Sequence, residues 1–137
     1  MPKPRFPDWS VRIVFLATFA FAELLLLTGT WQLAYLAGFL AGMLSLRARR
    51  AILLGGVGVA VAWAAYLVYV FVAGQGLQLA DLVGEILGVG KGAWWLLTVM
   101  TLVLGLLLGA VGGLTGYTAS RLFLWAEAEA IPEVPKG

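Results

Sequence analysis

The sequence between Gly92 and Ser120 contains no charged residue, and this uninterrupted apolar stretch restricts what the chain can fold into. It is longer than the roughly 20 residues that a helix needs to cross a hydrocarbon core about 30 Å thick. The whole chain follows the same trend, since 62% of its 137 residues are hydrophobic and only 12% are charged. Soluble domains are less apolar and more highly charged. The composition therefore indicates an integral membrane protein whose first partner is the lipid bilayer.

Four apolar segments have the character of membrane-spanning helices. No remaining stretch is long enough to form a soluble domain with its own core, so we expect one membrane domain, residues 1–126, and a short tail, residues 127–137. The predicted fold class is an all-α integral membrane protein with four transmembrane helices in a compact bundle. The expected spans are residues 9–28, 31–46, 51–73 and 93–123.

The distribution of cations predicts the orientation of these spans. If both termini are cytoplasmic, every Lys and Arg except Lys91 lies on the cytoplasmic side, as topology rules require. Trp31, Trp94 and Trp95 then fall at the outer interface, where aromatic side chains are enriched. We therefore expect a multi-pass protein of the cell membrane with cytoplasmic N- and C-termini. The cytoplasmic cations are Lys3, Arg5, Arg12, Arg47, Arg49, Arg50, Arg121 and Lys136.

The segment between the third and fourth spans has an amphipathic pattern over residues 77–87. We expect a short helix there, lying on the outer membrane surface or folded back as a lid, followed by a flexible return through Gly88, Gly90 and Gly92. The tail, rich in glutamate and proline, is expected to be exposed and poorly ordered. The two sides of the short helix carry Leu79, Val83 and Ile86, and Gln78, Asp81 and Glu85.

Small residues recur at helical spacing in three of the four predicted spans. In lipid, such stripes let two helix backbones approach closely. We expect these faces to pack within the bundle, and the alternative is that they contact a second copy or a larger membrane complex. The stripe on the fourth span is Gly105, Gly109, Gly112 and Gly116, with Gly113 beside it; the second span has Ala34, Gly38 and Gly42, and the third has Gly56, Ala60 and Ala64.

Glu23 is the one ionisable residue well inside a predicted span. A carboxyl group in hydrocarbon is costly, so it should face the bundle interior and find a hydrogen-bond donor or keep its proton. Matching of depths across the bundle places Tyr66, Thr98 and Thr101 at its level, which predicts a polar layer. This layer is either a structural hydrogen bond between helices or a proton or ion site with the hydroxyls as relay.

Two short motifs suggest ligands but have simpler explanations. Arg47, Arg49 and Arg50 form a basic turn that is suited to anionic lipid head groups, although charges that only retain this turn in the cytoplasm are the favoured explanation. The glycine-rich segment 88–92 includes Lys91 but lacks the spacing of a phosphate-binding loop, so we expect no nucleotide. The few cations are scattered over turns and termini, so we expect no nucleic-acid partner.

The residue types that are missing narrow the chemistry. The chain contains no Cys and no His, which excludes thiolate nucleophiles and imidazole ligands. We expect no cofactor, no metal site and no catalytic residues. The sequence favours a non-enzymatic subunit or assembly partner that forms a homo-oligomer or joins a larger membrane complex. The alternative is a small oligomeric channel or a proton- or ion-coupled transporter that uses Glu23.

Overall fold

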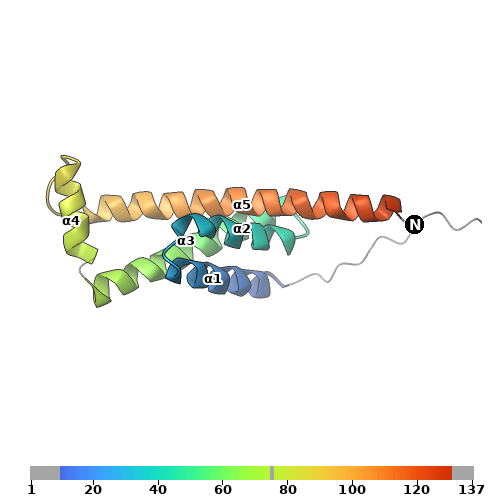
Figure 1. The fold of residues 1–137 in the computed structure, drawn as a ribbon, viewed down its shortest axis with the longest axis horizontal. Coiled ribbons are helices and arrows are strands. Elements are labelled where there is room, and N and C mark those ends of the chain that lie inside the picture. Colours follow the sequence, from blue (N-terminus) through green and yellow to red (C-terminus); the bar gives the residue numbers. More distant parts are fainter. Residues whose placement is uncertain (1–9, 75, 131–137) are drawn as a thin grey trace, which may run out of the picture.

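The computed structural model describes residues 10–74 and 76–130, and in these ranges all regular structure is helical (Figure 1). The short 3-10 helix η1 separates the first two α-helices and continues directly into the second. The elements are α1 (Val11–Leu27), η1 (Trp31–Leu33), α2 (Ala34–Met43), α3 (Ala48–Ala73), α4 (Gly76–Ile86) and α5 (Trp94–Ala130).

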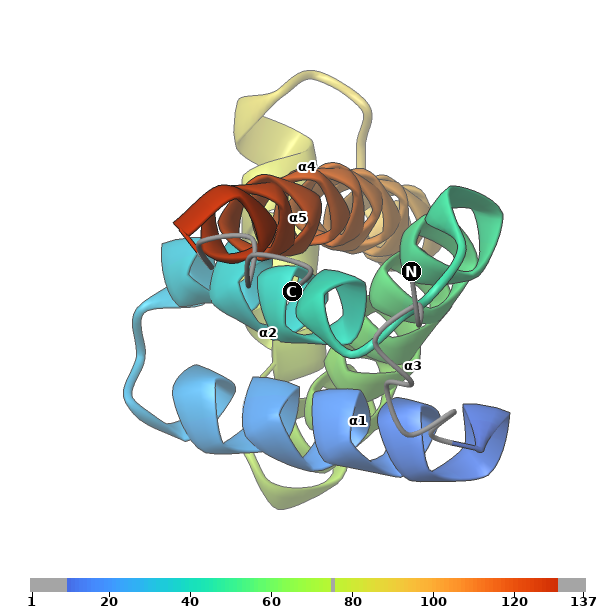
Figure 2. The same ribbon diagram turned by 90° about the vertical axis from the view of Figure 1, so that its right-hand side faces the viewer.

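The helices form three layers with α2 and α3 in the middle. Viewed from the end, α5 covers one side of the α2–α3 pair and α1 covers the other (Figure 2). The most extensive contacts are those of α5 with α2 and α3, whereas α1 does not pack directly against α5. The short helix α4 runs across one end of the molecule, where α3 ends and α5 begins (Figure 1).

Two described helices are long and apolar enough to cross a membrane, namely α3 and the Trp94–Phe123 part of α5. The sequence predicts four spans, and the lengths and compositions of the observed helices support two of them. The helix predicted over 9–28 is α1, with 17 residues, and the one predicted over 31–46 is α2, with only 10. At 1.5 Å per residue, α2 is about 15 Å long, roughly half the thickness of a hydrocarbon core.

Local hydrogen bonds explain why α2 is so short. Ser45 turns inward, donating from its hydroxyl to the Ala41 carbonyl at 2.7 Å, and its backbone N–H donates to Gly42. Arg47 then adopts an extended conformation, which stops one helix before the next starts. The sequence does not reveal this break, because Ser45 is the one polar residue among the apolar neighbours Leu44 and Leu46.

The other helix boundaries follow from capping residues and helix propensity. Ser10 caps α1, because its Oγ accepts the N–H of Ile13. The last helix, α5, continues to Ala130 and so reaches into the segment 127–137 that the sequence assigns to the tail. The part of that segment that belongs to α5, residues 127–130, consists of Glu and Ala, which are both strong helix formers, and no proline interrupts it.

The core is made of small side chains. Ala22, Ala37, Ala41 and Ala62 are completely buried, and the largest buried side chain is Trp63. Many Leu and Val residues lie on the outside instead, and exposed large apolar side chains occur on all five α-helices. A continuous apolar surface of this kind marks contact with a membrane or another protein.

The return from α4 to α5 is held by hydrogen bonds rather than left flexible. Gly88, Gly90 and Gly92 all have positive φ, a conformation that glycine adopts without a steric penalty. The carboxylate of Asp81 accepts the Gly92 N–H at 3.0 Å, and the Gly84 carbonyl accepts the N–H groups of Val89 and Gly90. The polar side of α4 thus ties down this loop.

Candidate functional site

The glycine stripe of α5 lies in the groove between α2 and α3. Gly109 contacts both helices: a Cβ added to Gly38 of α2 would lie 2.8 Å from the Gly109 Cα, and one added to Gly55 of α3 would overlap the Gly109 carbonyl. One turn further, Gly113 lies against Gly42 of α2 and Ala51 of α3. Real Cβ atoms do not approach so closely, so these positions accommodate only glycine without movement of the helices.

The rest of the stripe changes partner along the helix. Gly105 lies on the ring of Trp63, whose Cδ2 would be 3.0 Å from an added Cβ. Gly112 and Gly116 lie against α2, where an added Cβ would come within 2.9 Å of the Phe39 N and 3.0 Å of the Phe39 Cα, respectively. The surface that fills the α5 stripe therefore belongs to this chain.

The structure also reveals glycine contacts that the sequence stripes do not single out. Gly58 of α3 faces α1, where an added Cβ would lie 2.9 Å from the Thr18 Cγ2 and 3.3 Å from its Cβ. Thr18 is fully buried, with its hydroxyl donating to the Val14 carbonyl. The glycine-rich segment 55–58 indicates close helix packing in the sequence, but the spacing alone does not say which glycine faces which helix.

A hydrogen bond between Tyr35 of α2 and Thr115 of α5 joins the same two helices. Their hydroxyl oxygens are 2.6 Å apart, and Thr115 is within donor distance of the Gly112 carbonyl at 2.9 Å. Thr115 lies between Gly112 and Gly116, so close backbone contact brings the two side chains together. The sequence does not point to this pair, because neither residue lies at the expected depth of Glu23.

Replacing Tyr35 with phenylalanine should lower the free energy of unfolding by about 1 kcal/mol, because it removes one hydrogen bond between neutral groups. Reversible unfolding in SDS, followed by circular dichroism, measures this change. Tyr69→Phe is the matched control, since Tyr69 is exposed and its loss should leave the midpoint unchanged. Equal midpoints for the two variants would contradict a stabilising role for the Tyr35–Thr115 bond.

The residues of the predicted polar layer are not joined by hydrogen bonds to Glu23. Thr98 and Thr101 donate to carbonyls of their own helix, those of Trp94 and Leu97, both at 2.8 Å. Both residues lie on α5, and α1 does not pack against α5. Matching residues by depth says how far along the bundle a side chain lies, but not which helix it faces. Within the described ranges, the buried Oε1 of Glu23 has no hydrogen-bond partner.

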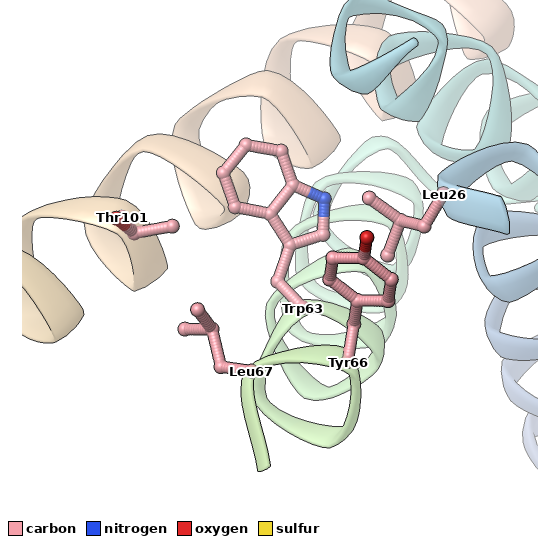
Figure 3. Close-up of a pocket in the computed structure, with 5 residues that line it drawn as sticks. All are labelled: Leu26, Trp63, Tyr66, Leu67 and Thr101. Carbon is pink, nitrogen blue, oxygen red and sulfur yellow. The ribbon is translucent and has the colours of Figure 1, made fainter. Parts of the chain in front are cut away.

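A pocket of about 130 Å³ lies close to this level, between α1, α3 and α5 (Figure 3). It brings together Tyr66 and Thr101 of the predicted layer with Trp63, which sequence analysis did not single out. The indole nitrogen of Trp63 is buried and, among the described residues, has no hydrogen-bond acceptor. The pocket is lined by Leu26, Trp63, Tyr66, Leu67 and Thr101.

The basic turn lies at the end of the molecule opposite α4 (Figure 1). Arg47, Arg49 and Arg50 are all exposed there. Arg121 of α5 joins them, donating from Nη2 to the Leu46 carbonyl at 2.7 Å, with its guanidinium carbon 5.2 Å from the centre of the Tyr117 ring. This end of the described chain is strongly basic, and a guanidinium ties α5 to the α2–α3 turn.

The described residues contain no group of three or more His, Asp or Glu side chains arranged to hold a metal ion. Comparisons with protein-family models, curated proteins and solved structures found no match for this chain. The site's own geometry is therefore the basis for assigning a function.

Proposed function

We propose that this chain is a small polytopic membrane protein, a bundle of four spans that acts as a non-enzymatic subunit of a homo-oligomer or of a larger membrane complex. The observation that carries the proposal is an uncovered apolar groove of about 350 Å³ between α3 and α5. Its floor includes Ala60 and Ala64, the part of the α3 stripe that the chain leaves open. Small side chains on a lipid-facing surface favour close approach of another transmembrane helix.

The charges of the two ends support four spans with both termini in the cytoplasm. The arginines of the α2–α3 turn and Arg121 lie at one end, and Arg12, in the first turn of α1, lies at that same end (Figure 1). Lys91 lies at the other end, near Trp94 and Trp95. Since short cytoplasmic loops collect Lys and Arg, the basic end is the cytoplasmic one. Arg47 and Arg49 there are placed to contact anionic lipid head groups.

The short second span fits this arrangement because other helices cover one face of α2, while Leu36 and Met43 stay exposed on the other. It lies between α1 and α5 beside α3, and its buried face comprises Ala34, Ala37, Gly38, Ala41 and Gly42. Turns within the hydrocarbon region are tolerated where neighbouring protein covers them. The turn at Ser45, whose side chain is buried, extends α2 at one end in this way.

The exposed face of α4 supports its placement on the outer membrane surface. Leu79 is 66% and Ile86 75% exposed, whereas Asp81 and Glu85 on the other side contact the return loop, through the Gly92 N–H and through Lys91 at 3.5 Å. A helix lying in the interface buries such an apolar face among the lipids. We propose that α4 rests on the bilayer in this way.

Ala64→Phe tests the assembly proposal, because the added ring occupies the groove. Purification in mild detergent followed by native mass spectrometry should retrieve the wild-type chain with a second copy or another membrane protein in fixed stoichiometry, and the variant alone. Val68→Phe is the control on the same helix, since Val68 is 60% exposed and does not line the groove. A wild-type protein that is always a lone chain would refute the proposal.

A second candidate function is proton or ion transport through Glu23, favoured by the unpartnered, buried Oε1 of its carboxyl group. An acid that lacks a structural partner inside a span is available to take up and release a cation. In liposomes, this function predicts a proton or ion flux that Glu23→Gln abolishes, and labelling of Glu23 by a carboxyl-reactive carbodiimide. No flux and no labelling would leave the subunit function as the remaining candidate.

A further inference from the structure

The helices of the bundle do not all reach the end at which α4 lies. Figure 1 shows that α1 and α2 stop short of this end, whereas α3 and α5 continue up to α4. The chain turns back between α1 and α2 over residues 28–33, and α3 continues to Ala73. The outer side of the molecule therefore has a step, with α1 and α2 on its low side and α3 and α5 on its high side.

Contacts between the helices give the height of the step. Leu26, in the last turn of α1, lines the same pocket as Tyr66 of α3 and Thr101 of α5, so these three residues lie at one level (Figure 3). Beyond this level α3 continues for seven residues to Ala73, and α5 begins seven residues before Thr101, at Trp94. At 1.5 Å per residue, both helices project about 10 Å beyond the level of Leu26.

The surface on the high side of the step is apolar. Segments 66–73 and 94–101 contain no charged residue, and Val72 is 83% exposed. The helix α4 above them also exposes large apolar side chains, those of Leu79 and Ile86. Apolar surface is favourable in hydrocarbon and costly in water. The high side therefore requires lipid chains up to the level of α4.

The turn on the low side has the opposite requirement. Thr28, Thr30 and Gln32 are all exposed, and the backbone reverses direction here between two helices. Irregular backbone that faces lipid is not tolerated in the hydrocarbon region, because its N–H and C=O groups find no water there. The turn therefore requires water or lipid head groups at its own level, about 10 Å below the outer end of α3.

A flat bilayer does not satisfy both sides of the step. An outer boundary at Ala73 would leave the exposed turn inside the hydrocarbon, and a boundary at the turn would leave about 10 Å of apolar helix outside it. Bilayers adapt to a short hydrophobic segment by thinning locally. A change in thickness around the protein therefore resolves the conflict.

We propose that the outer leaflet descends along α1 and α2, so that phospholipid head groups reach the turn at residues 28–33 while acyl chains cover α3 and α5 as far as α4. The exposed side chains of Thr30 and Gln32 offer hydrogen bonds to the phosphate and ester oxygens of these lipids. The step thus binds lipids of the outer leaflet and thins the bilayer on one side of the protein only. This proposal rests on the four-span placement of the proposed function.

Nitroxide labels on single cysteines test the step, because the chain contains no native Cys. In phosphatidylcholine liposomes, EPR power saturation compares the access of oxygen, which is concentrated in hydrocarbon, with that of a polar nickel chelate, which stays in water. The label on Val72→Cys should be reached by oxygen and shielded from nickel, and the label on Thr30→Cys should be reached by nickel. Val72 lies about 9 Å beyond the level of Leu26, so the depths of the two labels in lipid should be opposite to their order along the bundle.

Leu16→Cys is the control, since Leu16 is 61% exposed on α1 and belongs in hydrocarbon whether the bilayer is flat or stepped. A Leu16 label that nickel reaches would refute the four-span placement itself. With Leu16 shielded, a shielded Thr30 label would show a flat bilayer that covers the turn, and a Val72 label reached by nickel would show a flat bilayer at the level of the turn. Either result overturns the proposal, as does a Val72 label that neither reagent reaches, since protein would then cover α3.

Discussion

Gly109→Ala should separate α5 from α2 and α3 and lower the free energy of unfolding by about 3 kcal/mol, the upper end of the range for overpacked cores. The added Cβ would overlap the carbonyl of Gly55 and lie 2.8 Å from the Gly55 carbonyl carbon and 2.9 Å from the Val59 Cβ. Backbone atoms cannot rotate away as a side chain does, so the helices must move apart. The midpoint of SDS unfolding, followed by circular dichroism, measures the change.

Helix propensity makes this substitution a sharp test, because the preference of helices for alanine over glycine would raise the stability, whereas the steric clash lowers it. Alanine in a helix interior is favoured over glycine by about 1 kcal/mol, so without close packing the variant would be more stable than the wild type. Val111→Leu is the control, since Val111 is 53% exposed on the same helix and should tolerate a methylene group. A Gly109→Ala protein as stable as the wild type would show that α5 is not packed as the structure describes.

The double variant Thr18→Cys with Gly58→Cys should form an intramolecular disulfide in nearly every molecule upon mild oxidation. The Cβ–Cβ separation at this pair, 3.3 Å with an added Cβ at Gly58, is just below the usual range of about 3.5–4.5 Å for disulfides. The chain contains no native Cys, so no competing thiol interferes. Gel mobility under non-reducing conditions and thiol counting measure the yield.

The disulfide tests whether α1 packs on α3 as the structure describes. The control pair is Thr18→Cys with Val61→Cys, because Val61 lines the groove on the side of α3 that faces α5 and should give no crosslink within the chain. A crosslinked protein should also resist SDS unfolding more strongly than its reduced form, since the bond restricts the separated helices. Equal yields from the two pairs would indicate a mobile α1 and contradict the layer order.

Sequence patterns predict the helices of this chain well where a long apolar run defines them. The third and fourth expected spans, 51–73 and 93–123, correspond to α3 and α5, because both runs are long and apolar and contain no proline. The second, 31–46, is overestimated because apolar character does not distinguish Leu44–Leu46 in a turn from the same residues in a helix. That break depends on where Ser45 finds a carbonyl acceptor.

The candidate site was harder to predict than the helices. Spacing identifies Gly109, Gly112 and Gly116 as a close-packing face, yet the assignment of each glycine to α2 or α3 depends on helix crossing, which sequence spacing does not encode. Depth matching fails for Thr98 and Thr101 in the same way, since it gives a level along the bundle and no direction around it. Trp63 gives no polar signal in the sequence, because only its packed environment isolates the indole N–H.

The central claim, four spans with α4 outside, is tested most directly by the accessibility of single cysteines in this Cys-free chain. Thr30→Cys places a thiol between α1 and η1, Ala48→Cys one at the start of α3 and Gln78→Cys one on α4. In intact cells a membrane-impermeant maleimide should label the Thr30 and Gln78 variants, and should label the Ala48 variant only after permeabilisation. If the Thr30→Cys variant, like the Ala48→Cys variant, is labelled only after permeabilisation, then α1 and α2 do not cross the membrane. That result would contradict the four-span account.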